Sequence, residues 1–118
     1  MADAPQVLLL CKDLFFTSQL HGAIKQAELV GRTCLSMEQC QKQIREHRES
    51  VVAVIADLEQ DGFDVAALKG EMAESARLIV FGPHVREDLF VRAKDGGADV
   101  LLTRGQAASS MGQLLADL

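Results

Sequence analysis

The sequence predicts an α/β domain built around a parallel β-sheet. Three short apolar runs, at residues 51–56, 78–81 and 100–102, each end at polar or Gly/Pro residues and are separated by stretches with helical periodicity. A fourth apolar run, at 7–10, lies near the start of the chain. This alternation is typical of βαβ units, and unbroken apolar runs indicate strands that are covered on both faces. We therefore expect helices on both sides of the sheet.

The first half of the chain contains the signals for two strands and two helices. A strand is predicted at 7–10, and the segment 11–18 opens a helix that Gly31 is expected to end. A short second strand is predicted at 32–35. Ser36 and Gln39 match the capping pattern S/T-x-x-E/Q, which places the start of the second helix at Ser36. The apolar stripe of the first helix consists of Phe16, Leu20, Ala23, Ile24 and Ala27.

The second half continues the same alternation. The strand at 51–56 is followed by a loop at 57–62 and a helix at 63–72, and the strand at 78–81 stops at Gly82-Pro83. A helix at 85–95 ends at Gly96-Gly97, a strand follows at 100–102, and a last helix is predicted at 107–118. We interpret the chain, residues 1–118, as one domain of five β/α repeats.

Composition excludes several classes of protein. The net charge of -5 and the scattered Lys and Arg residues argue against nucleic-acid binding, which usually needs a concentrated basic face. Residues 1–6 lack the features of a signal peptide, and no apolar run approaches the ~20 residues of a membrane span, so we expect a cytoplasmic protein without a membrane partner. The three cysteines form no C-x-x-C pair, which favours free, mostly buried thiols.

The strand at 51–56 ends at Asp57, and this carboxylate is the first candidate for a functional site. In parallel α/β sheets, ligands and chemistry gather at the carboxyl ends of the strands. The alternative interpretation is structural: Asp57 caps the following loop by accepting backbone N–H groups.

Together these motifs resemble the receiver domain of two-component response regulators. The resemblance rests on Asp57, on the turn Asp61-Gly62, and on the run Gly97-Ala98-Asp99-Val100-Leu101-Leu102-Thr103-Arg104, which is similar to the receiver pattern G-A-x-x-(Y/F)-(I/L/V)-x-K-P. It implies a flavodoxin-like sheet of five strands in the order 2-1-3-4-5 with about five helices, and it makes Asp57 the candidate phosphoacceptor.

Several positions depart from the receiver pattern. The receiver Ser/Thr position falls on Gly82, and the acidic pair that would hold Mg²⁺ falls on Cys11 and Lys12, with Asp13 one place beyond. Arg104 takes the position of the receiver Lys, and Gly105 that of the Pro. Asp13 and Asp57 remain as weak Mg²⁺ candidates, so the chain is similar to a degenerate, or pseudo-, receiver, and we expect no cofactor unless the conventional receiver interpretation holds.

We expect Lys12 and Arg104 to approach Asp57 and to form a standing ion pair in place of Mg²⁺, with the guanidinium gripping the carboxylate bidentately. Arg104 could instead be a solvated charge at a strand end. His84, in the loop after the strand at 78–81, is a candidate pocket residue, or else an exposed loop histidine.

These observations predict a stand-alone, non-enzymatic signalling module that works mainly through phosphorylation-independent protein interaction. Its partner would be a histidine kinase or a downstream effector. A homodimer is possible through the face of strand 4, helix 4, strand 5 and helix 5, which would include Val85, Leu89, Phe90 and Arg92.

Two alternatives stay open. The first is a conventional receiver phosphorylated on Asp57. The second, more remote, is a phosphotransfer enzyme based on Cys11, although a Cys-x₅-Arg loop would need an Arg where Thr17 stands. The loop after the first strand contains neither glycine-rich phosphate motif, so a nucleotide-binding enzyme is disfavoured.

Overall fold

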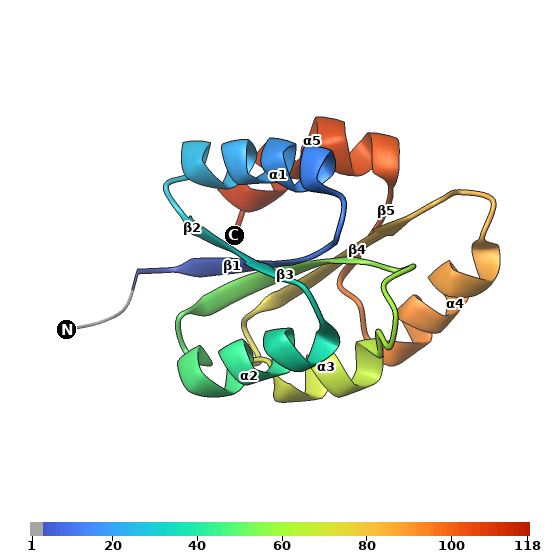
Figure 1. Cartoon of the computed structure of the whole chain (residues 1–118), viewed down its shortest axis with the longest axis horizontal. Helices are drawn as coiled ribbons and strands as arrows, with labels where there is room; N and C mark the ends of the chain where they lie inside the picture. Colours follow the sequence, from blue (N-terminus) through green and yellow to red (C-terminus); the bar gives the residue numbers. More distant parts are fainter. Residues whose placement is uncertain (1–3) are drawn as a thin grey trace.

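The computed structural model describes residues 4–118, which form a three-layer α/β sandwich (Figure 1). Five parallel strands form one sheet in the order β2-β1-β3-β4-β5, which confirms the predicted flavodoxin-like fold. The elements are β1 (Gln6–Leu10), α1 (Leu14–Gln26), β2 (Val30–Cys34), α2 (Met37–His47), β3 (Val51–Asp57), α3 (Val65–Glu71), β4 (Arg77–Gly82), α4 (Glu87–Gly96), β5 (Val100–Thr103) and α5 (Arg104–Ala116).

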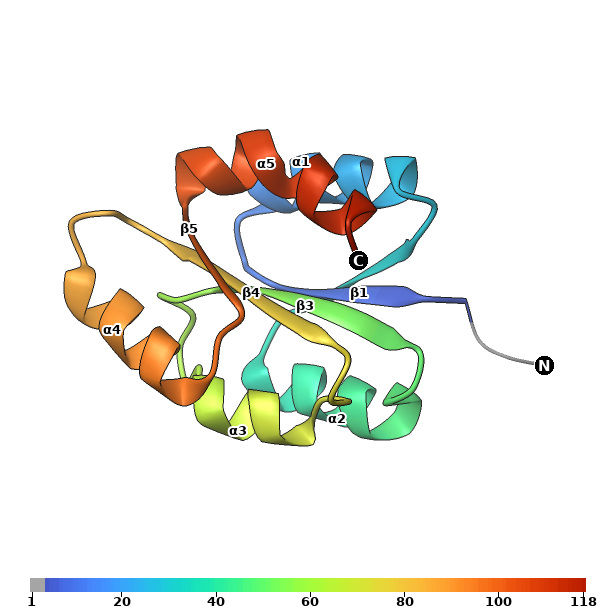
Figure 2. The ribbon, with the colours of Figure 1, turned by 180° about the vertical axis from the view of Figure 1, so that it is seen from behind.

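Helices cover both faces of the sheet, as the unbroken apolar strands predict. In Figures 1 and 2, α1 and α5 lie side by side on one face, and α2, α3 and α4 lie on the other. All five strands run in the same direction, so their carboxyl ends meet at one edge of the sheet. The residues that follow β1, β3, β4 and β5 are brought together at this edge.

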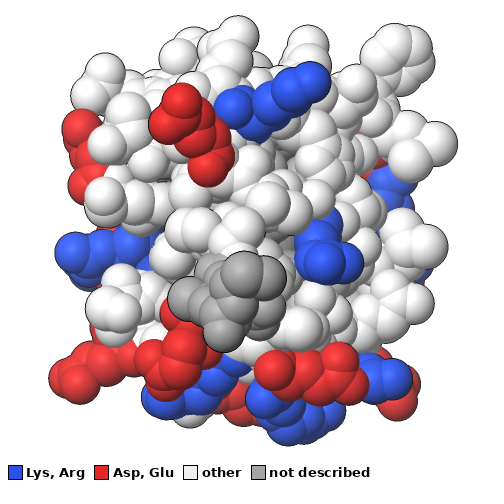
Figure 3. Space-filling model, turned by 90° about the vertical axis from the view of Figure 1, so that its left-hand side faces the viewer, with Lys and Arg blue, Asp and Glu red and all other residues white. Residues whose placement is uncertain are grey.

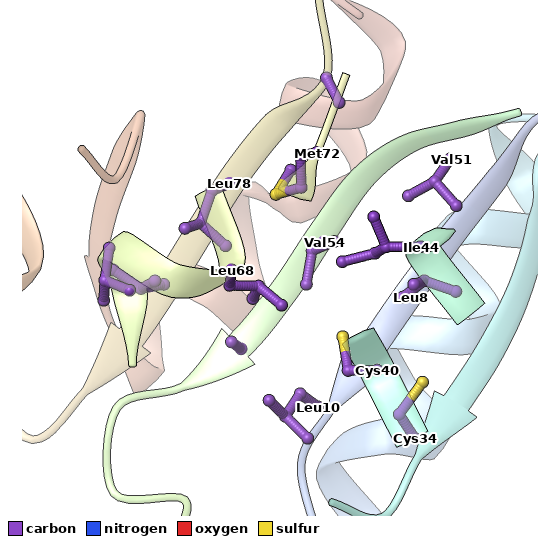
Figure 4. Packing of buried hydrophobic residues seen from close by; sticks show 14 of the residues in the cluster. Leu8, Leu10, Cys34, Cys40, Ile44, Val51, Val54, Leu68, Met72 and Leu78 are labelled. Atoms are coloured by element: carbon purple, nitrogen blue, oxygen red, sulfur yellow. The ribbon is translucent and has the colours of Figure 1, made fainter. Parts of the chain in front are cut away.

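The sheet divides the core into two clusters because successive residues of a strand point to opposite faces. Leu8 and Leu10 of β1 pack toward α2 and α3, whereas Val7 and Leu9 pack toward α1 and α5, and all four are 0% exposed. Figure 4 shows the first cluster, in which strand side chains meet those of the two helices; its labelled residues are Leu8, Leu10, Cys34, Cys40, Ile44, Val51, Val54, Leu68, Met72 and Leu78.

The structure corrects the predicted exit of the first helix. Gly31 does not end α1 but lies inside β2, which begins at Val30, two residues earlier than predicted. The helix ends instead at Gln26, with Ala27 as its C-cap, and Glu28 follows in the left-handed region (φ 63°). Gly31 is required by packing, since a Cβ there would lie 2.5 Å from the Nδ1 atom of His21.

The structure also corrects the start of the last helix, which begins at Arg104 and not at 107. A capping box fixes this start: the Thr103 hydroxyl accepts the Gln106 N–H (3.2 Å), and the Gln106 side chain accepts the Thr103 N–H (2.9 Å). The sequence T-R-G-Q carries this signal. As a result, Arg104 follows β5 directly and lies at the carboxyl edge of the sheet.

Other predictions are confirmed. Gly97 ends α4 with φ 103°, and Cys11, Cys34 and Cys40 are free and buried. Ser36 caps α2 by accepting the Gln39 N–H at 3.1 Å. Across residues 4–118, no helix is long and apolar enough to cross a membrane.

Candidate functional site

Asp57 is the last residue of the central strand β3, and its side chain lies partly buried at the carboxyl edge. Its side chain is only 13% exposed. The Oδ1 atom accepts the Glu59 backbone N–H at 2.9 Å, so Asp57 does cap the following loop. The Oδ2 atom faces Arg104, so Asp57 takes part in a second interaction besides this cap.

Arg104 bridges two carboxylates that are far apart in the sequence. Its Nη1 atom donates to Asp13 Oδ2 at 3.0 Å, and its Nη2 atom donates to Asp57 Oδ2 at 3.3 Å. The guanidinium therefore divides its two outer nitrogens between the carboxylates and does not grip Asp57 bidentately. Burial lowers the pKa of Arg104, but Asp13 and Asp57 outweigh this effect, so the pKa is raised.

The rings of two phenylalanines contact the Arg104 guanidinium. The Arg104 Cζ atom lies 5.0 Å from the ring centroid of Phe16 and 5.6 Å from that of Phe81, distances typical of cation–π contacts. The two rings are in contact with each other, with centroids 4.8 Å apart. Sequence reasoning missed both residues because each also belongs to the hydrophobic core.

Asp13 holds its carboxylate in place by capping α1. Its Oδ1 atom accepts the Phe16 backbone N–H at 3.1 Å, while Oδ2 receives Arg104. The N–H of Phe16, followed by the Arg104 guanidinium, lowers the pKa of the Asp13 carboxyl. The ion pair with Arg104 thus joins the first turn of α1 to the first turn of α5.

Cys11 lies on the buried side of the site, next to Asp57. It is 1% exposed, and its Sγ atom lies 4.0 Å from Asp57 Oδ2. Burial raises the pKa of the Cys11 thiol, which opposes formation of the thiolate that a nucleophilic cysteine needs. Leu14 and Phe15, in the segment where a phosphate loop would be, are bulky and exposed. The geometry therefore gives the Cys11 phosphotransfer hypothesis no support.

Lys12 and His84 do not join this cluster. Lys12 is exposed, and within residues 4–118 the salt bridges of Asp57 and Asp13 come from Arg104 alone. The expected approach of Lys12 to Asp57 is wrong because Cys11 turns inward, so its neighbour faces solvent. His84 is exposed and lines a separate hollow of about 450 Å³ with Phe90 and other residues of the α4 and β5 region.

The position of the receiver hydroxyl is closed by packing. At Gly82, the last residue of β4, a Cβ atom would lie 3.2 Å from Leu58 Cδ1 and 3.3 Å from Leu58 Cβ. Leu58 is 7% exposed, and its N–H donates to the Phe81 carbonyl at 2.8 Å, so burial and this hydrogen bond restrict its movement away from position 82. A side chain at position 82 would compete with Leu58 for the same space.

The residues at the site do not fit a Mg²⁺ ion. Mg²⁺ prefers several hard oxygen ligands, but both carboxylates are already paired with Arg104, and the side chain that lies 4.0 Å from Asp57 Oδ2 is the soft thiol of Cys11. Among residues 4–118, no group of three or more His, Cys, Asp or Glu residues is placed to hold a metal ion.

Comparison with known proteins identifies the fold. No protein-family model matches the sequence, and a search of curated proteins finds no match. Solved structures of response regulators are similar. A response regulator from Thermotoga maritima has a TM-score of 0.77 at 13% identity, over 98% of this chain and 100% of that one. The signal receiver domain of the putative response regulator NarL from Mycobacterium tuberculosis has a TM-score of 0.75 at 15% identity, over 98% and 95%.

A third similar structure is a response regulator protein from Burkholderia pseudomallei with a phosphorylated aspartic acid. It has a TM-score of 0.72 at 17% identity, over 96% of this chain and 72% of that one. The chain therefore has the fold of response-regulator receiver domains.

Proposed function

We propose that this chain is a degenerate receiver-like module of two-component signalling that acts mainly through phosphorylation-independent protein interaction. The observation that carries the proposal is the bridge from Arg104 to Asp13 and Asp57 over Phe16 and Phe81. The receiver fold supports the signalling context, and the altered pocket supports the loss of phosphorylation.

The bridge opposes phosphoryl transfer in two ways. A phosphoacceptor carboxylate reacts when a metal ion and a cation neutralise the incoming phosphoryl oxygens. Here, the permanently charged guanidinium of Arg104 already neutralises Asp57 and lies between the two carboxylates that a metal would need. Moreover, Gly82 offers no hydroxyl to follow a phosphoryl group, and Leu58 fills the space beside it.

The proposed mode of action is docking of a signalling partner, such as a histidine kinase or a downstream effector, in the cytoplasm and without a bound cofactor. The supporting feature is the face of β4, α4, β5 and α5, where His84, Phe90, Val91 and Leu101 line the hollow of about 450 Å³. Val85 and Val91 are 74% and 59% exposed at this face. The net charge of -5 makes nucleic acid an unsuitable partner.

The test is the intact mass of the chain after incubation with acetyl phosphate and Mg²⁺, with Asp57→Asn as the matched control. We expect no added phosphoryl group in the wild type, in a sample shown by circular dichroism to be folded. An added group in the wild type that Asp57→Asn lacks would overturn the proposal in favour of a conventional receiver. Asp57 is partly accessible, at 13% exposure, so a negative result would not simply reflect complete burial of this carboxylate.

A further inference from the structure

Cys34 and Cys40 place two thiols next to each other on one face of the sheet. Cys34 is the last residue of β2, and Cys40 lies near the start of α2. Both belong to the core cluster of Figure 4, which shows their side chains as neighbours. They are 4% and 0% exposed. The third cysteine, Cys11, belongs to the other core cluster, on the opposite face of the sheet.

The turn between β2 and α2 holds the two cysteines in this arrangement. The Leu35 N–H donates to Gln39 Oε1 at 2.9 Å, and the Cys40 N–H donates to the Ser36 carbonyl at 3.1 Å. The Ser36 hydroxyl in turn accepts the Gln39 N–H at 3.1 Å, which caps the helix. These bonds fix the start of α2 relative to the end of β2. The turn therefore keeps Cys40 close to Cys34, as a disulfide requires of its two partners.

Cys34 lies at an opening in the surface, whereas Cys40 is fully buried. Cys34 lines a hollow of about 270 Å³, and the charged residues of its wall are Arg32, Lys42 and Glu46. Cys40 points into the core from α2, and in Figure 3 charged side chains gather along the lower side of the molecule, where α2 and α3 lie. A small polar oxidant in the hollow can therefore reach the sulfur of Cys34 before that of Cys40.

The two thiols also differ in acidity. Hydrogen bonding from the Cys40 thiol lowers the pKa of Cys34 more than burial raises it, and the Arg32 guanidinium lowers it further. The same interaction, together with burial, raises the pKa of Cys40. Oxidation of a cysteine follows its thiolate character and its accessibility. Both properties make Cys34 the thiol that reacts first, with a protonated Cys40 beside it.

We infer that Cys34 and Cys40 form a redox-active pair, which hydrogen peroxide or another hydroperoxide converts to a disulfide. In the first step, the Cys34 thiolate attacks one peroxide oxygen. An S–O bond forms, the O–O bond breaks, and the hydroxide that leaves takes up a proton to become water, so Cys34 becomes a sulfenic acid. In the second step, the Cys40 sulfur attacks the Cys34 sulfur. The S–S bond forms, the S–O bond breaks, and the hydroxyl leaves as water with the Cys40 proton, so two electrons pass from the thiols to the peroxide.

The inference goes beyond the proposed function and does not depend on whether Asp57 is phosphorylated. The disulfide would tie β2 to α2 beside Leu35, whose carbonyl accepts the Gln60 side chain at 3.4 Å. Gln60 belongs to the loop that follows Asp57, so the pair lies next to a segment of the candidate site. Since exchange with a thiol reductant reverses a disulfide, the pair would report the redox state of its surroundings.

The test is peptide mass mapping of the full chain, treated with hydrogen peroxide in the folded state and alkylated after denaturation. Trypsin cuts after Arg32 and Lys42, so both cysteines of the pair fall within the peptide 33–42, and Cys11 falls within the peptide 1–12. We expect the peptide 33–42 to lose two hydrogen atoms and to resist alkylation, and dithiothreitol to restore both thiols. This disulfide should form at least about tenfold faster than Cys11 is oxidised.

Two variants separate the steps. Cys40→Ala should leave Cys34 as a sulfenic acid that dimedone traps, formed more slowly than in the wild type because the Cys40 thiol no longer lowers the pKa of Cys34. The matched control, Cys11→Ala, should form the same disulfide as the wild type. Circular dichroism checks that both variants are folded, and the result for the wild type needs no variant.

A wild-type peptide 33–42 that stays fully alkylated, in a sample where the same peroxide oxidises added glutathione, would overturn the inference. So would a disulfide that joins Cys11 to either of the other cysteines.

Discussion

Replacing Arg104 by methionine tests the site most directly, because it removes the charge and keeps an unbranched side chain over the two rings. The Arg104 and Asp57 side chains are 40% and 13% exposed, so their ion pair is only partly screened by solvent. Such a pair contributes up to about 1 kcal/mol to the free energy of unfolding. The contacts with Phe16 and Phe81 add about 0.5–1 kcal/mol. The pair with Asp13 is more exposed, with 40% of each side chain accessible, and solvent screens it more strongly.

We therefore expect Arg104→Met to lower the free energy of unfolding by about 0.5–2 kcal/mol, or the thermal midpoint by about 2–8 °C. Urea and thermal unfolding measure both quantities, and a double-mutant cycle with Asp57→Asn isolates the ion pair. The matched control is Arg45→Met, which breaks the 3.3 Å salt bridge to Glu71 on the opposite layer. It should cost less than about 0.5 kcal/mol.

The same variant also tests whether the Arg104 ion pair takes the place of a metal ion or is an ordinary surface contact. Without Arg104, Asp13 and Asp57 are left as unpaired carboxylates that can attract a divalent cation. Mg²⁺ should then stabilise Arg104→Met, by about 1.4 kcal/mol at a free concentration ten times its dissociation constant, and leave the wild type unchanged. An equal response of the two proteins to Mg²⁺, or an unchanged stability of Arg104→Met, would refute the reasoning.

Three further predictions concern packing and charge. Gly82→Thr should cost about 1–3 kcal/mol through contact with Leu58, and Leu58→Ala in the same chain should recover part of this loss in urea unfolding. Burial raises the pKa of Asp99, but the Lys69 ammonium and a backbone N–H outweigh it and lower the pKa. The stabilisation by Asp99 is therefore present above its ordinary value of 3.8 and is lost as the pH falls below it, so the difference in urea midpoint between wild type and Asp99→Asn should shrink in acid. Ile44→Ala, at a side chain that is 0% exposed, should cost about 2–5 kcal/mol in the same assay.

The central strands could be predicted from the sequence, and the edges of the sheet less well. β1, β3 and β4 are covered on both faces, so their apolar runs mark them clearly. β2 is an edge strand whose first four residues are exposed or half-buried, and it has no apolar run. Its start was therefore placed two residues late, and Gly31 was assigned to a helix exit although it serves packing against His21.

The site could be predicted in part, because parallel topology brings the carboxyl ends of the strands together. This rule places Asp13, Asp57 and Arg104 at one edge, where the structure joins them by ion pairs. It does not fix the direction of individual side chains, and for this reason Lys12 was wrongly expected to contact Asp57. The aromatic support of Arg104 was missed since Phe16 and Phe81 look like ordinary core residues in the sequence.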